Sequence, residues 1–155
     1  MSEIKMERAK KVYATLCGAL DERNWKYEKV DDELLVHFTV QGDDLPIQYL
    51  IFVDVDRQLL RLLSPLPFDM SEDKRIDGAI ATCHATYGLM DGSFDYDLSN
   101  GRISYRMTSA FLDNEIPASV VHYMIDFAGV IVDKYNDKFF ALNKGFLTIE
   151  KFLAD

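Results

Sequence analysis

The sequence predicts an α+β domain in which one antiparallel sheet packs against helices. Three observations predict it. Apolar residues recur at every second position in residues 34–40 and 47–53, and they alternate with polar ones on both sides of Asn100-Gly101. Apolar residues recur at spacings of three and four in residues 3–23, 71–87 and after Pro117. The order is therefore helix, three strands, helix, two strands, helix and a short helix, in a single domain of residues 1–155.

The first helix is predicted over residues 3–23, where one face is apolar. The second begins after Ser71, whose side chain is a favoured N-cap. Its apolar stripe is expected to face the core, as core-facing stripes of surface helices do. The residues of this stripe are Ile76, Ala79, Ile80, Cys83 and Tyr87.

The third helix is predicted to begin near Pro117, since proline is favoured in the first turn. We expect a break near Asn136-Asp137, because a helix reaching Leu142 would be long. Gly145 would end the helical segment, and Thr148 would cap a short terminal helix.

Three strands are predicted before the second helix, over Glu33–Gln41, Pro46–Asp54 and Gln58–Ser64. Turns separate them at Gly42-Asp43-Asp44 and around Asp54–Gln58. The prolines of Ser64-Pro65-Leu66-Pro67 predict a stiff connector after the third strand.

The hairpin at Asn100-Gly101 is predicted to close with a two-residue type I′ turn, in which both central residues have positive φ. Such a turn fixes the pairing of the two strands and puts their apolar residues on one face. The expected pairs are Leu98 with Ile103, Tyr96 with Tyr105, Phe94 with Met107, and Asp95 with Arg106.

The strands of residues 33–64 carry apolar residues on both faces, whereas a half-exposed antiparallel sheet alternates cleanly. Leu35, Leu50 and Phe52 break the alternation, together with Leu60 or Leu62. The simpler expectation is that one of the protein's own helices covers this second face. The alternative is a partner protein or a second subunit, which makes Leu35, Leu50 and Phe52 the candidate partner-binding residues.

Composition excludes several classes of protein. The net charge of −9 is unfavourable for a nucleic-acid binder, which needs a positive patch. No apolar run approaches the roughly 20 residues that span a bilayer, so no membrane partner is expected. The first residues have mixed charge and no apolar core of a signal peptide, which predicts a cytoplasmic protein. Cys17 and Cys83 are then expected to be free thiols.

No catalytic or cofactor motif is present in the sequence. It has no phosphate-binding glycine loop and no GxSxG. His37, His84 and His122 fall on separate predicted elements, which argues against a metal site. An EF-hand starting at Asp95 fails, because its sixth and twelfth positions are Asn100 and Arg106. We therefore predict a non-enzymatic protein without cofactor, metal or catalytic residues.

Three segments and the order of elements resemble the YbjN family, bacterial domains named for sensory transduction regulation, and the type III secretion chaperone-like fold. The segments are IQYLIFVDVDRQLLRLLSPLP over 47–67, GSFDYDLSNGRISYR over 92–106, and the ending, with Asp133-Lys134-Tyr135, Gly145 and TIEKF over 148–152. Residues 81–85, ATCHA, depart from the Asn-rich stretch expected late in the second helix.

The resemblance implies a type III secretion chaperone-like fold and no catalytic residues. Secretion chaperones of this fold are small acidic dimers that hold extended segments of a client protein. The leading hypothesis is thus a homodimeric protein-binding module, chaperone-like or regulatory, with a protein partner.

Two other functions stay open at this stage. One is a small-ligand sensor with a pocket between the sheet and the C-terminal helix, lined by Tyr49, Tyr96 and Tyr105. The other, more remote, is a metal-assisted hydrolase that uses scattered carboxylates.

Overall fold

The computed structural model describes residues 2–155 as a six-stranded antiparallel sheet with four α-helices. The strand order is β1-β2-β3-β4-β6-β5. The helices are α1 (Glu3–Glu22), α2 (Arg75–Tyr87), α3 (Ala118–Lys144) and α4 (Ile149–Ala154). The strands are β1 (Glu28–Val30), β2 (Leu35–Gln41), β3 (Pro46–Asp54), β4 (Leu59–Asp69), β5 (Ser93–Asp97) and β6 (Arg102–Ala110), with 3₁₀ turns η1 (Asp31–Glu33) and η2 (Glu72–Lys74).

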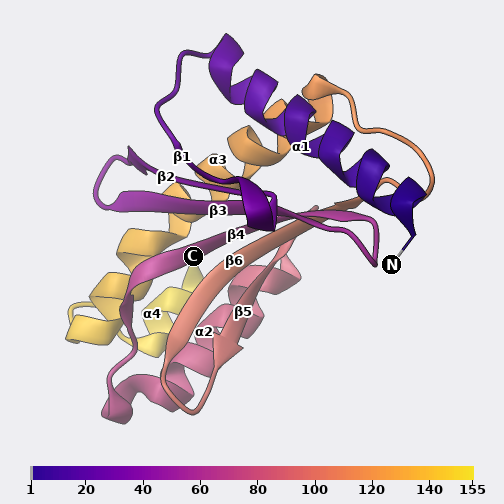
Figure 1. Cartoon of the computed structure of the whole chain (residues 1–155). Coiled ribbons are helices and arrows are strands. Elements are labelled where there is room, and N and C mark those ends of the chain that lie inside the picture. Colours follow the sequence, from indigo (N-terminus) through magenta and orange to yellow (C-terminus); the bar gives the residue numbers. More distant parts are fainter. Residues whose placement is uncertain (1) are drawn as a thin grey trace.

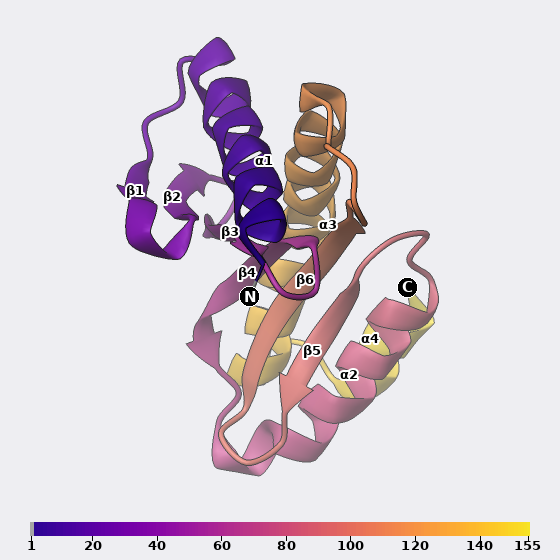
Figure 2. The ribbon, with the colours of Figure 1, turned by 45° about the vertical axis from the view of Figure 1, so that its right-hand side comes forward.

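The helices gather on one side of the twisted sheet (Figures 1 and 2). On that inner face nearly every strand residue is buried, for example Val36, Ile51, Leu62 and Tyr105. On the opposite, outer face no residue of β2 to β6 is fully buried. The core thus lies in one layer between sheet and helices, and the predicted α+β architecture is confirmed.

The strand β1 was not predicted. It is three residues long and pairs with β2, with Glu28 opposite His37. Two tyrosines hold it near α1, since the Tyr13 hydroxyl donates to Asp31 Oδ1 at 2.8 Å and that of Tyr27 donates to Asp21 Oδ1 at 2.8 Å. So short and charged a strand has no hydrophobic period that a sequence pattern could reveal.

The predicted two-residue turn is wrong. The β5–β6 loop has four residues, Leu98–Gly101, because Asp97 pairs with Arg102. The Asp97 carboxylate accepts hydrogen bonds from both the N–H and the hydroxyl of Ser99, which builds a longer turn. Only Gly101 has positive φ, at 78°. The pairings of Phe94, Asp95 and Tyr96 shift by two residues, so that Phe94 lies opposite Tyr105 and the paired apolar residues stay on the predicted face. Leu98, predicted opposite Ile103, lies in the loop and is exposed.

The predicted connector at Ser64–Pro67 is also wrong, because β4 continues through both prolines to Asp69. The backbone oxygen of Gln58 accepts a hydrogen bond from the N–H of Phe111, which lies just beyond β6. The backbone N–H and C=O groups of the even-numbered β4 residues therefore point toward β6, and those of the odd-numbered residues, the prolines included, lie on the side of β3. On that side β3 and β4 pair only from Leu50–Leu63 to Asp54–Leu59. The missing N–H groups of Pro65 and Pro67 therefore fall where the two strands diverge, a position at which a sheet tolerates proline.

The ends of the helices confirm some predicted caps and correct others. Gly145 ends α3 in the left-handed conformation, and the Thr148 hydroxyl accepts from Lys151 N–H to cap α4. Ser71 does not cap a helix, since its hydroxyl donates to Asp73 and the 3₁₀ turn η2 precedes α2. The predicted break at Asn136-Asp137 is absent, and α3 is continuous, with Asn136 facing the core.

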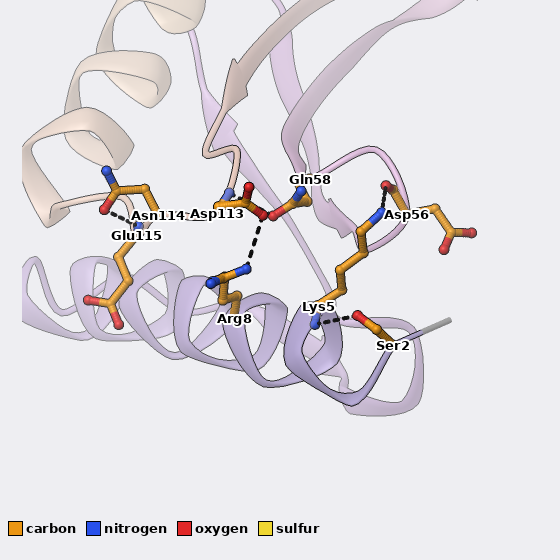
Figure 3. A network of polar contacts seen from close by, with 8 residues as sticks. All are labelled: Ser2, Lys5, Arg8, Asp56, Gln58, Asp113, Asn114 and Glu115. Atoms are coloured by element: carbon orange, nitrogen blue, oxygen red, sulfur yellow. Dashed lines mark hydrogen bonds and ion pairs between the residues drawn. The ribbon is translucent and has the colours of Figure 1, made fainter.

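The N-terminal half of α1 is tied to two loops by polar contacts (Figure 3). Lys5 Nζ donates to the backbone oxygen of Asp56 in the β3–β4 turn at 3.1 Å. Arg8 pairs with Asp113 at 3.0 Å, and the Asp113 N–H donates to Gln58 Oε1. These contacts fix the start of α1 against the ends of β4 and β6.

Among residues 2–155, no helix is both long and apolar enough to cross a bilayer.

Candidate functional site

The outer face of the sheet carries an apolar cluster made of Leu35, Leu50, Phe52 and Leu63, here called the outer-face cluster. These residues come from three adjacent strands, because Leu35 lies opposite Phe52 and Leu50 opposite Leu63. The Arg61 guanidinium lies 5.2 Å from the centre of the Phe52 ring and also faces Asp54 at 3.8 Å. All four apolar side chains are half-buried.

No helix within residues 2–155 covers the outer-face cluster, so the expectation of cover by the protein's own helix is wrong. The helices are already engaged on the inner face, where α1 and α3 pack against each other and on β3. The structure brings the predicted residues Leu35, Leu50 and Phe52 together on one open surface. Their role in binding a partner stays a prediction.

A second apolar surface lies on α2 and was predicted as core. The side chains of Ile76, Ala79, Ile80, Cys83 and Tyr87, here called the α2 face, point outward. Tyr87 is 93% exposed. The helix instead buries its small residues, Gly78, Ala81 and Ala85, together with Thr82.

Close approach to the sheet explains the reversal on α2. A Cβ on Gly78 would lie 2.6 Å from the hydroxyl oxygen of Tyr96, so the helix packs where only glycine fits. The Tyr96 hydroxyl donates to the Arg75 carbonyl at 2.7 Å and fixes this approach. The small residues Gly78, Ala81 and Ala85 were the sequence signal for the buried side of α2. That signal was missed, because the stripe of larger apolar residues predicted the opposite side.

Two hollows flank the α2 face. One, about 520 Å³, lies toward α4 and includes His84 and Leu153. The other, about 570 Å³, lies toward β5 and includes Phe94, Tyr96 and Leu98. The α2 face is thus a ridge between two grooves, a shape that suits packing against another helix.

The edge strand β5 is partly closed by α2. Phe94 donates its N–H to Thr86 Oγ1 at 3.0 Å, and the same hydroxyl donates to the Phe94 carbonyl at 3.4 Å. One threonine thereby satisfies both outward backbone groups of Phe94. This arrangement blunts the edge against pairing with another strand.

The three tyrosines suggested for a ligand pocket do not line one together. Tyr49 and Tyr105 are core residues whose hydroxyls donate to the carbonyls of Ile125 and Asp91, each at 2.9 Å. Burial raises the pKa of both phenols above the ordinary value. Tyr96 belongs to the α2 contact described above.

The residues with metal-binding or nucleophilic side chains are dispersed. His37 lies on β2, His84 packs near Phe152, and His122 Nε2 lies 3.1 Å from Glu22 on α1. Cys17 is buried, and burial raises the pKa of its thiol, whereas Cys83 is exposed on the α2 face. Within residues 2–155, no three His, Cys, Asp or Glu side chains are placed to share a metal ion.

Comparison with known proteins identifies the fold. No protein-family model and no curated protein sequence matches the chain. Among solved structures, the ExsC–ExsE complex superposes with a TM-score of 0.59 at 12% identity, over 83% of this chain and 93% of the matched one. YbjN from E. coli superposes with a TM-score of 0.58 at 9% identity, over 81% and 92%. The chain has the type III secretion chaperone-like fold of YbjN, as the sequence predicted.

Proposed function

We propose that this protein is a non-enzymatic, cytoplasmic protein-binding module, chaperone-like or regulatory, which holds a segment of a partner protein and works as a homodimer. The observation that carries the proposal is the outer-face cluster, an apolar surface on the sheet that no helix within residues 2–155 covers. Apolar patches of this kind on soluble proteins mark interaction sites. That one of the similar structures named above is itself a protein–protein complex supports this function.

The partner segment is assigned to the outer-face cluster. Leu35, Leu50 and Phe52 form an apolar floor on β2 and β3, and Leu63 on β4 extends it toward β6. Arg61, stacked on Phe52, gives the floor one cationic group within reach of a partner's carbonyl or carboxylate. An extended segment with alternating apolar side chains matches a surface with this spacing.

The second copy of the chain is assigned to the α2 face. In a two-fold contact the same surface serves both copies, so it must be complementary to itself. The shape of the α2 face supports this assignment, since a ridge between two grooves offers a groove for the same ridge of another copy. Ala79 and Cys83 are small and lie near the middle of the ridge, where two helices approach most closely.

The experiment that tests the proposed function is affinity purification of the tagged protein from its native host, with quantitative mass spectrometry of what accompanies it. We expect one protein in stoichiometric amount with the wild type, and its loss with Leu50→Asp, which puts a charge into the outer-face cluster. Ser119→Asp is the matched control, since it adds the same charge at an exposed position of α3.

Two outcomes contradict the proposal. One is a stoichiometric protein retained equally by Leu50→Asp and wild type, since the partner would then bind elsewhere. The other is a wild-type preparation with no bound protein, which favours the small-ligand sensor. Circular dichroism and the melting temperature of Leu50→Asp establish that the variant is folded.

A further inference from the structure

A third concave surface lies between the β2–β3 turn and α3, with a volume of about 420 Å³. It is here called the acidic-aromatic cleft. It lies on the helix side of the sheet and shares no residue with the outer-face cluster or the α2 face. Its lining residues used below are Trp25, Asp43, Tyr49, Asp126, Gly129 and Asp133.

Two glycines keep this cleft open. A Cβ on Gly129 would lie 2.8 Å from the Tyr49 hydroxyl oxygen, which donates to the Ile125 carbonyl. A Cβ on Gly42 would meet Asp133 Oδ1 at 2.5 Å and the Leu45 carbonyl at 2.6 Å. A larger residue at position 42 would push the turn away from α3, and one at position 129 would displace the Tyr49 hydroxyl. The close approach of turn and helix is thus built into the sequence.

One wall of the cleft is aromatic. The Tyr49 ring stacks on Phe38 with centroids 4.8 Å apart, and Trp25 contacts Phe38 edge-on at 5.5 Å. The half-buried Trp25 lines the cleft, and the Arg23 guanidinium lies 5.8 Å from the centre of its ring.

The other wall carries three carboxylates, of which only one is neutralised. Arg23 binds Asp126 through two hydrogen bonds of 2.6 and 2.9 Å. Asp43 and Asp133 form no ion pair with any residue of the described chain. The fold holds them together, since the Asp43 N–H donates to Asp133 Oδ1 at 2.8 Å. The neighbouring Asp133 carboxylate raises the pKa of Asp43 above its ordinary value.

We infer that the acidic-aromatic cleft receives a lysine or arginine side chain of the partner protein, from a part of it that lies outside the segment on the outer-face cluster. The inference rests on the proposed function for the source of that side chain. Two uncompensated carboxylates attract a cation, and the aromatic wall suits the apolar stem of such a side chain. An anionic group would meet repulsion from both carboxylates. The net charge of −9 favours basic partners over the whole surface.

The test uses small probes and the isolated protein, so that it does not depend on knowing the partner. The probes are N-acetyl-arginine methylamide and N-acetyl-lysine methylamide, with N-acetyl-citrulline methylamide as the neutral isostere of the first. Trp25 is the one tryptophan of the chain, so its fluorescence reports on this cleft alone. Amide shifts of Gly42, Asp43 and Gly129 in NMR spectra give an independent measure.

We expect saturable shifts at these amides with the basic probes and binding about tenfold weaker, or absent, with the citrulline probe. Asp43→Asn/Asp133→Asn should weaken binding of the basic probes by a similar factor. Asp32→Asn/Asp44→Asn is the control, since it removes the same two charges from exposed residues that do not line the cleft.

Equal binding of the citrulline and arginine probes would overturn the inference, and so would unchanged binding by the double variant or no shift at all. Tighter binding of magnesium chloride or putrescine, with displacement of the arginine probe, would also overturn it and assign the cleft to a free cation. Failure of the proposed function has a different signature. In that case Leu50→Asp retains the partner while the response to the arginine probe is unaffected.

Discussion

Replacing Ile76 and Ile80 by serine should separate two copies joined through the α2 face. Ile76 is 65% exposed and Ile80 is 43% exposed in the single chain. Full burial of an isoleucine contributes about 2 kcal/mol, so burying the exposed parts contributes about 1.3 and about 0.9 kcal/mol. Each residue occurs twice in a two-fold contact, which makes the total about 4 kcal/mol. The dissociation constant of the dimer should therefore rise about a thousandfold.

The assay is sedimentation velocity over a series of protein concentrations. Neither side chain contributes to the core, so the melting temperature of the variant should stay close to that of the wild type. Ile4→Ser is the matched control, because Ile4 is 60% exposed on α1 and lies outside the α2 face. A wild type that is monomeric at every concentration would refute the reasoning. So would an Ile76→Ser/Ile80→Ser variant that dimerises as tightly as the wild type.

Three further outcomes follow from the structure. A short bismaleimide should link two chains through Cys83 near the middle of the α2 face, and denaturing electrophoresis should show the linked dimer. The link should be lost in Ile76→Ser/Ile80→Ser, and unchanged linking in that variant would contradict the assignment of the dimer contact to the α2 face. Gly101→Ala should lower the free energy of unfolding, measured by urea titration, by about 2 kcal/mol or more, because Gly101 has a positive φ and a Cβ there would collide with the Met70 carbonyl. Gly88→Ala is the control and should be neutral or stabilising, since Gly88 has a negative φ and open space around it. Asp43→Asn should melt at a higher temperature than the wild type at pH 7, because the pKa of Asp43 is raised in the folded protein, so that ionising Asp43 opposes folding. The difference in melting temperature should vanish below about pH 4, as Asp43 becomes protonated in both the folded and the unfolded protein. A difference that does not change with pH would disprove the repulsion between Asp43 and Asp133.

The β5–β6 hairpin shows what a local pattern can decide. The alternation of Phe94, Tyr96, Ile103 and Tyr105 correctly predicted which side chains share a face. The Asn-Gly pair predicted the wrong turn, because Asp97 and Ser99 form a competing network that lengthens the loop. A shift of two residues preserves the side-chain faces, so the error in the turn did not spread into the core.

Helix α2 shows what periodicity leaves open. A stripe of apolar residues at helical spacing predicts one apolar face, and it does not decide whether that face meets the protein's own core. Here the core side consists of Gly78, Ala81 and Ala85, because Tyr96 and the sheet approach too closely for larger side chains. On β2 and β3 the broken alternation predicted that Leu35, Leu50 and Phe52 share the second face of the sheet, and the structure places them there. Whether a partner binds them stays a prediction.

The acidic-aromatic cleft could not be found from the sequence. Trp25, Asp43 and Asp133 come from a loop, a turn and a helix that are far apart in the chain. Only the packing of α3 against the β2–β3 turn brings them together. Asp43 and Asp44 looked like ordinary turn residues, and nothing in the pattern linked them to residue 133.

The two prolines of β4 also have a consequence before the chain has folded. Residues 59–68 of β4, LLRLLSPLPF, contain five leucines and one phenylalanine. A run of this composition without proline is the kind of segment that associates between unfolded chains into cross-β aggregates. Pro65 and Pro67 cannot donate to such a ladder, and Arg61 interrupts the remaining stretch with a charge. The residues that let β4 diverge from β3 in the native sheet thus also protect the newly made chain from aggregation.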